Sequence, residues 1–299
     1  MQRSREQILE WEARWRTPVA AATILGVVLL VASLVVVSGI GGDGSAEFLR
    51  EVDRDSSRIV LSGVLQTIGF FLLGAALVYL FRAAQGRSEK VRSQLIGLFV
   101  VAPIFLGLGA GLNSLSTTEA ADTFVAGEAS ADLTRADAGE ECRDERDDDR
   151  DAFADDYPGG DPLAECVATK LEDDEADDAI AGASLKGIAF GLQIAGMLGL
   201  AFSLMYGCLN AMRAGLLTRF WGSLGMALGV AAIFALPLTW LWFLYFGFLL
   251  LGAVPGGRPP AWETGEAVPW PSPGERAAAE IEAEPRDPDE PRRKRKQRE

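Results

Sequence analysis

The chain has 299 residues, of which 49% are apolar and 23% are charged, and its formal net charge is −14. Apolar and charged residues lie in separate blocks, and several uncharged stretches of about 20 residues are long enough to cross a bilayer. The absence of histidine excludes a Ser-His-Asp triad, His-ligated zinc and imidazole acid–base chemistry. The sequence therefore predicts an all-α, polytopic transmembrane helix bundle rather than one or two soluble domains.

The uncharged stretches predict about six spans, in two groups of three at residues 19–115 and 180–254. The four that are clearly delimited cover residues 19–40, 59–81, 94–115 and 186–206. The last run, 220–254, has 35 residues without a charge and is longer than one crossing requires. Because Pro237 lies near its middle, we expect a tight helical hairpin there. One tilted span plus a re-entrant piece is the alternative.

Basic residues near the span ends predict the orientation. Nineteen Lys and Arg residues fall in the N-terminal tail (1–18), in the connections 82–92 and 207–219, and in the C-terminal tail (255–299). The opposite side holds three in its first loop and five in its long loop. We therefore expect a multi-pass protein of the plasma (cytoplasmic) membrane with both termini in the cytoplasm.

The long loop, residues 116–179, carries 23 Asp and Glu against 5 Lys and Arg. It is predicted to be extracytoplasmic, solvated and partly disordered, as acidic runs usually are. Neither of its acidic runs has the ligand spacing of an EF-hand, so diffuse Ca²⁺ or Mg²⁺ binding is the alternative. No metal-ligating, catalytic or cofactor-binding residue is predicted anywhere in the chain.

Two of the three cysteines, Cys142 and Cys166, lie in this acidic loop, whereas Cys208 lies at the cytoplasmic end of the fourth span. Two cysteines on the oxidising face and a reduced one inside fit a disulfide between Cys142 and Cys166. Two unpaired thiols in a flexible loop are the alternative.

The predicted spans contain no Asp or Glu, and so they lack the carboxylate that ion-coupled transporters commonly place in the bilayer. Gln66 and Gln193 are the candidates for an intramembrane polar site. A shift of 127 residues aligns 64–80 with 191–207 and pairs these two glutamines. Lipid tails cannot satisfy an amide, and we therefore expect both side chains to face the bundle interior.

The C-terminal tail, residues 255–299, is rich in proline and is predicted to be extended or disordered. It ends in a basic cluster, Arg292 to Arg298, which should be attracted to anionic lipid of the inner leaflet. Because the tail is tethered beside a negative membrane, we expect lipid and not nucleic acid to be its partner.

Three strings carry a family resemblance: LQTIGFFLLGAALVYLFRAA, LNAMRAGLLTRFWGSLGMALGV and GRPPAWETGEAVPWPSP. They resemble an uncharacterised family of bacterial multi-spanning integral membrane proteins with a domain of unknown function. The likeness covers the second, fourth and fifth spans and the early C-terminal tail, and it leaves out the acidic loop. It implies class and localisation only, since no activity or functional residue comes with that family.

Two functions of different classes remain. The first is a non-enzymatic bundle that associates with itself or with another membrane protein, as an assembly or regulatory component. The second is a facilitative carrier of a small molecule or lipid. A continuous cavity that touches both Gln66 and Gln193 would favour the carrier, and a solid core would favour the bundle. An enzyme is not expected, because no nucleophile, base or metal cluster converges in the sequence.

Overall fold

The structure is a computed structural model that describes residues 4–89, 91–130 and 132–270, and within these ranges every regular element is a helix. Five of the described helices are long and apolar enough to cross a membrane. They are α1 (Arg5–Val37), α3 (Ser56–Arg87), α4 (Ile96–Val125), α8 (Lys186–Arg213) and α9 (Arg219–Leu251). They fit a multi-pass membrane protein, which confirms the all-helical membrane class.

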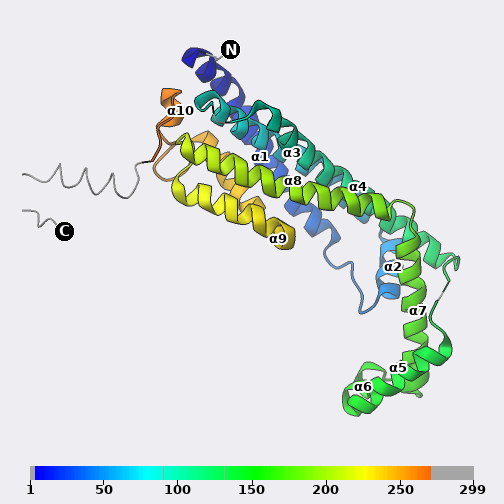
Figure 1. Cartoon of the computed structure of the whole chain (residues 1–299). Coiled ribbons are helices and arrows are strands. Elements are labelled where there is room, and N and C mark those ends of the chain that lie inside the picture. Colours follow the sequence, from blue (N-terminus) through cyan, green and yellow to red (C-terminus); the bar gives the residue numbers. More distant parts are fainter. Residues whose placement is uncertain (1–3, 90, 131, 271–299) are drawn as a thin grey trace, which may run out of the picture.

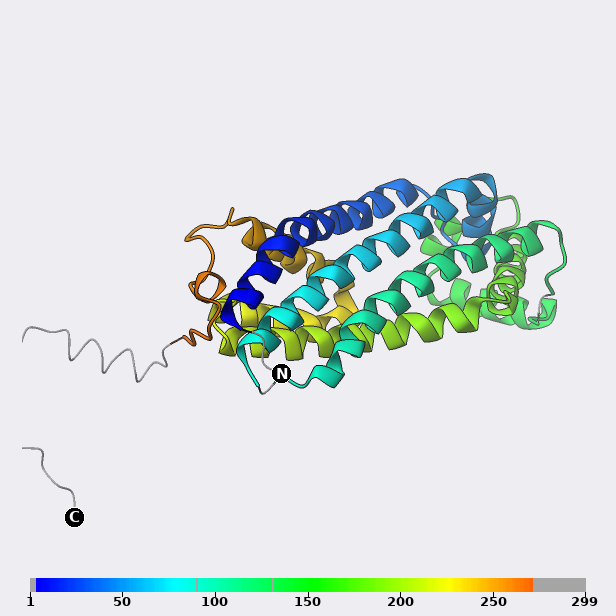
Figure 2. The same ribbon diagram turned by 90° about the horizontal axis from the view of Figure 1, so that it is seen from above.

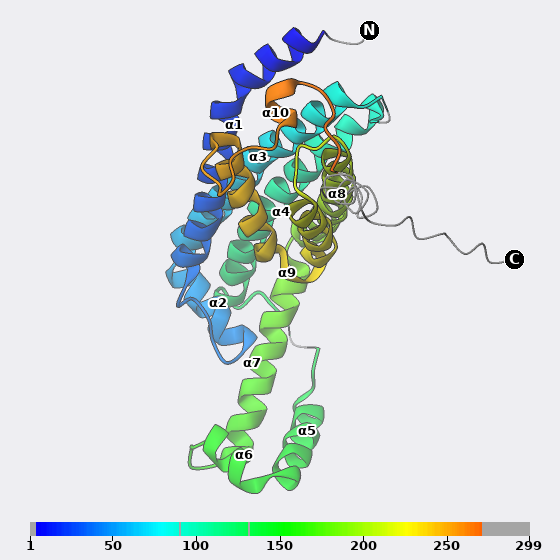
Figure 3. The same ribbon diagram turned by 90° about the vertical axis from the view of Figure 1, so that its left-hand side faces the viewer.

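Four of these helices form one curved layer. Helices α1, α3, α4 and α8 lie side by side in that order, and each runs antiparallel to the one before it (Figure 2). Small residues permit the close approach. A Cβ atom on Gly26 of α1, for example, would lie only 2.9 Å from the carbonyl oxygen of Gly69 on α3. Helix α9 covers one face of the layer and contacts α8 and α1, the two outermost helices (Figure 3).

Helix α9 is a hairpin, as the position of Pro237 predicted. Ala235 has non-helical backbone angles (φ −143°, ψ 60°) that separate two arms of about 16 residues each. The Trp221 and Tyr245 rings stack at a centroid distance of 3.4 Å, whereas a straight helix would hold them about 36 Å apart. Each arm is about 24 Å long, and Phe234 at the tip is 90% exposed.

The two ends of the bundle differ in charge. One end collects the start of α1, the end of α3, the end of α8 and both ends of α9 (Figure 1). We call it the basic end, since Arg5, Arg14, Arg82, Arg87 and Arg213 lie there. The other, the acidic end, carries α2 (Ser45–Arg54), α5 (Arg135–Asp148), α6 (Arg150–Asp156) and α7 (Pro162–Gly182).

The predicted acidic loop at 116–179 is helical over most of its length, which corrects the expectation of a partly disordered segment. Helix α4 continues to Val125, and α5, α6 and α7 form an arm that projects from the bundle (Figures 1 and 3). A short polar side chain caps the N-terminus of each of the three helices of this arm. Thr134, Asp149 and Asp161 accept hydrogen bonds from the first free backbone N–H groups of α5, α6 and α7.

Residues 255–270 were predicted as part of a disordered tail, and for this segment the prediction is wrong. The segment includes α10 (Ala261–Thr264) and packs on the basic end, where Trp262 is only 5% exposed. The indole of Trp262 donates to the Leu216 carbonyl oxygen (2.9 Å), and that of Trp270 donates to the Leu217 carbonyl oxygen (2.8 Å). These carbonyls follow the last turn of α8 and lack helical partners. Residues 271–299, with Arg292 to Arg298, lie outside the described residues.

The N-terminal tail (1–18) is helical from Arg5 onward and continuous with the first span. An ion pair buries its Glu12 against Arg87 of α3, whose side chain is fully buried. Both carboxylate oxygens of Glu12 accept from the guanidinium, one of them at 2.9 Å. Arg87 also donates to the Ala261 carbonyl oxygen (2.7 Å) and lies over the Trp262 ring (5.5 Å). The pair therefore joins α1, α3 and the C-terminal segment.

Candidate functional site

The two glutamines of the predicted intramembrane site are not joined. Gln66 and Gln193 are both half-buried. The Gln66 amide donates to the Ser62 hydroxyl of its own helix (3.1 Å), and the Gln193 side chain packs beside Gly109 of α4. Within the described ranges no hydrogen bond links the two amides. Neither glutamine lines any of five pockets found among the described residues.

The predicted disulfide between Cys142 and Cys166 is confirmed. It links α5 to α7 across a Cα–Cα distance of 6.1 Å, and both cysteines are fully buried beside Phe153. Cys208 is free and buried in the bundle. The disulfide thus holds together the far part of the arm, which has few large apolar side chains of its own.

Lys170 adds an electrostatic contact next to the disulfide. Its ammonium group lies 3.3 Å from the carboxylates of both Glu141 and Glu145 on α5. The pKa of Lys170 is raised overall. Partial burial acts to lower this pKa, but the hydrogen bonds to Glu145 and Glu141 act in the opposite direction and prevail. Burial, reinforced by the nearby Glu145, raises the pKa of Tyr157. Both groups therefore keep their protons at neutral pH.

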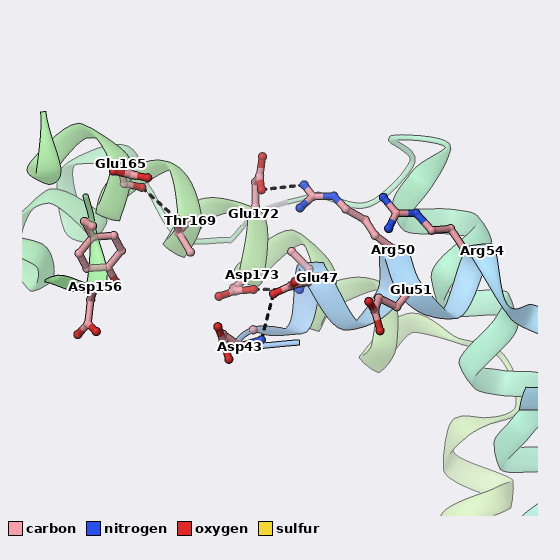
Figure 4. A pocket seen from close by; sticks show the side chains of 13 residues that line it. Asp43, Glu47, Arg50, Glu51, Arg54, Asp156, Glu165, Thr169, Glu172 and Asp173 are labelled. Atoms are coloured by element: carbon pink, nitrogen blue, oxygen red, sulfur yellow. Dashed lines mark hydrogen bonds and ion pairs between the residues drawn. The ribbon is translucent and has the colours of Figure 1, made fainter. Parts of the chain in front are cut away.

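A polar groove of about 690 Å³ opens between α2 and α7 at the acidic end (Figure 4). Its lining carries seven carboxylates and only two guanidinium groups. The carboxylates are those of Asp43, Glu47, Glu51, Asp156, Glu165, Glu172 and Asp173, and the guanidinium groups are those of Arg50 and Arg54. This concentration of negative charge makes the groove the candidate functional site.

The apolar face of α2 positions one side of the groove. Ala46, Leu49 and Val52 recur every three residues and are buried. They pack against alanines of α4 and α7, namely Ala120, Ala121, Ala176 and Ala179. Because alanine has the smallest side chain with a Cβ, the three helices approach closely there. The polar face of α2, with its Glu and Arg residues, is left to face the groove.

Carboxylates of α7, on the other side of the groove, bond to groups of α2. Asp173 accepts from the backbone N–H of Ala46 (2.9 Å) and so caps the start of α2, where Gly44 offers no side chain. Glu172 pairs with Arg50 (2.8 Å), and Asp177 accepts from the Ser45 hydroxyl (2.6 Å). Members of the run LEDDEADD such as Glu172 and Asp177 are solvent-exposed, as expected, and they also act as acceptors for groups on α2. Their spacings of one, four and five residues along one helix were the available signal.

Some groove carboxylates remain open to a ligand. Asp43 and Asp156 accept no hydrogen bond and join no ion pair from the part of the chain that the structure describes. Among the described residues no three His, Cys, Asp or Glu side chains converge closely enough to hold a metal ion. The row of carboxylates along the groove suits an extended organic cation or a row of basic side chains.

Comparisons with protein-family models, with curated proteins and with solved structures return no match to this chain.

Proposed function

We propose that the protein is a non-enzymatic, membrane-anchored docking component, whose arm binds a basic segment of a partner protein at the acidic groove. The observation that carries the proposal is the groove itself, in which seven carboxylates line a cavity of about 690 Å³. Its two sides are held together by the contacts of α2 with alanines of α7, and the disulfide of the arm stabilises the α7 side further. A preformed acidic groove accelerates the encounter with a basic partner and selects against acidic ones.

The dense packing inside the bundle favours a docking component over a facilitative carrier. Large side chains fill the part nearest the basic end, and the largest fully buried ones are those of Tyr79, Phe81, Phe99, Trp242, Phe243 and Phe246. Gln66 and Gln193 line none of the five pockets found. A carrier that used both glutamines would require a path that connects them.

The proposal places the basic end in the cytoplasm and the acidic arm outside, in line with the distribution of Lys and Arg. The α9 hairpin starts and ends at the basic end. Its arms, at about 24 Å, are shorter than a hydrocarbon core of about 30 Å. Whether the two arms of α9 form two short spans or a re-entrant pair, the two termini of the chain lie on the same side of the membrane.

Site-specific photo-crosslinking in intact cells tests the docking function. With a photo-reactive residue at Thr169, inside the groove, we expect a discrete adduct between the full chain and one partner protein. The substitutions Asp43→Lys and Asp156→Lys reverse two open charges, and they should reduce this adduct about tenfold through like-charge repulsion.

The matched control reverses two exposed acids on α5 outside the groove, Glu140→Lys and Asp144→Lys, and should leave the adduct unchanged. An adduct that survives the groove reversal, or the complete lack of one, would contradict the docking function. If instead Gln66→Leu and Gln193→Leu abolish the phenotype of the gene while the groove reversal does not, the carrier is favoured.

A further inference from the structure

A second groove, of about 730 Å³, lies near the basic end and is almost entirely apolar. Helix α3 provides its floor with Gly74 and Ala75, α1 provides Trp11 and Trp15 on one side, and α4 provides Pro103 on the other. Phe71 and Ile104 of the same lining are exposed although they lie in membrane-spanning helices. The groove therefore opens toward the lipid and not toward water.

Small residues create this groove. A Cβ atom on Gly74 would lie 2.8 Å from Cγ of Pro103, so α4 sits close to α3 at this level. Ala75, the next residue, projects only a methyl group into the space between α1 and α4. Along α3 the lining extends from Phe71 to Arg82, about 16 Å. This length accommodates most of one acyl chain.

The end of the groove nearest the basic end holds a cation without a protein partner. Arg82 is half-buried and lines the groove. Within the described ranges it makes no hydrogen bond and no ion pair, whereas Arg87, five residues later on α3, is paired with Glu12. A partly desolvated guanidinium without a counter-ion is unfavourable. Its planar fork matches a carboxylate or a phosphate, and phosphate is the anionic group that phospholipid headgroups supply at this depth.

We infer that this groove binds a phospholipid with an anionic headgroup, one acyl chain lying over Gly74 and Ala75 and the phosphate facing Arg82. The two indoles of Trp11 and Trp15 lie where the chain meets the headgroup region, the depth that tryptophan prefers in membranes. The occupant is a lipid of the bilayer and not a free anion, because only a lipid covers both the apolar floor and the cation. This groove shares no lining residue with the acidic groove.

Native mass spectrometry of the full chain, released from detergent in the presence of added phosphatidylglycerol, measures the binding. Arg82→Gln should weaken the phosphatidylglycerol adduct about fivefold, the effect expected for one basic residue near a membrane surface. Ala75→Trp, which fills the floor, should weaken it by at least as much. Phosphatidylcholine in place of phosphatidylglycerol should bind the unchanged protein about fivefold more weakly.

Two variants control for charge and for bulk. Arg213→Gln removes an exposed arginine at the same end, and Leu61→Trp enlarges an exposed residue of α3 outside the groove. Both should bind phosphatidylglycerol as the unchanged protein does. Equal binding by Arg82→Gln and Ala75→Trp would overturn the inference. Displacement of the adduct by inorganic phosphate would also overturn it, since a free anion would then be the ligand.

Discussion

Replacing Arg87 with methionine while Glu12 is kept should destabilise the protein by about 3–5 kcal/mol. The Arg87 side chain is fully buried, and the Glu12 side chain beside it is 5% exposed. Loss of the guanidinium leaves a charge in the protein interior with no partner, and it removes two donors to the Ala261 carbonyl oxygen. The C-terminal segment should detach from the bundle as a consequence.

The stability can be followed with a thiol-reactive dye, because Cys208 is free and buried until the bundle unfolds. We expect the thermal midpoint to fall by roughly 10 °C in Arg87→Met. The double variant Glu12→Gln, Arg87→Met removes the buried charge and should recover much of the loss. Arg5→Met breaks an exposed ion pair with Glu266 and should cost less than about 1 kcal/mol. A fall no larger than that of Arg5→Met would show that the pair does not stabilise the bundle.

The second large effect is expected in the arm. Replacing Cys142 and Cys166 with serine opens a loop of about 25 residues, which the disulfide stabilises by about 3.5 kcal/mol. The arm depends on this bond, since few large apolar side chains surround it. Cleavage by trypsin at Arg143, Arg146, Arg150 and Lys170 should therefore accelerate by about two orders of magnitude.

The same change should leave the stability of the bundle unaltered, because neither cysteine lies in α1, α3, α4, α8 or α9. The thermal midpoint reported by Cys208 should stay where it is. Cys208→Ser serves as the control for proteolysis and should leave the arm as resistant as before. An arm whose cleavage rate does not change, or a bundle that melts earlier together with it, would contradict this division of stability.

Several features could be read from the sequence because a short-range rule governs them. In lipid every backbone polar group must be satisfied within its own helix, and long uncharged runs therefore become helices whatever their tertiary contacts. Pro237 marks the turn of α9 because proline disrupts helical hydrogen bonding. Cys142 and Cys166 were paired because only these two cysteines share one side of the predicted topology.

What the sequence did not reveal depends on contacts between distant segments. Glu12 and Arg87 are separated by 75 positions, and their charges appeared only as parts of an N-terminal tail and a basic connection. Proline density suggested disorder in residues 255–270, yet Trp262 finds a free carbonyl at Leu216. The same limit applies to the acidic groove, since the partners of an acidic run are invisible until α2 and α7 are placed together.

The orientation of the bundle is the claim on which the rest depends, and reporter fusions test it most directly. A reporter that is active only in the cytoplasm should work when fused after Gln85 and after Gly265, both at the basic end. It should be silent when fused after Ala129, which lies between α4 and the disulfide-linked arm. Activity after Ala129 would place the acidic groove in the cytoplasm and contradict the proposed docking of an external partner.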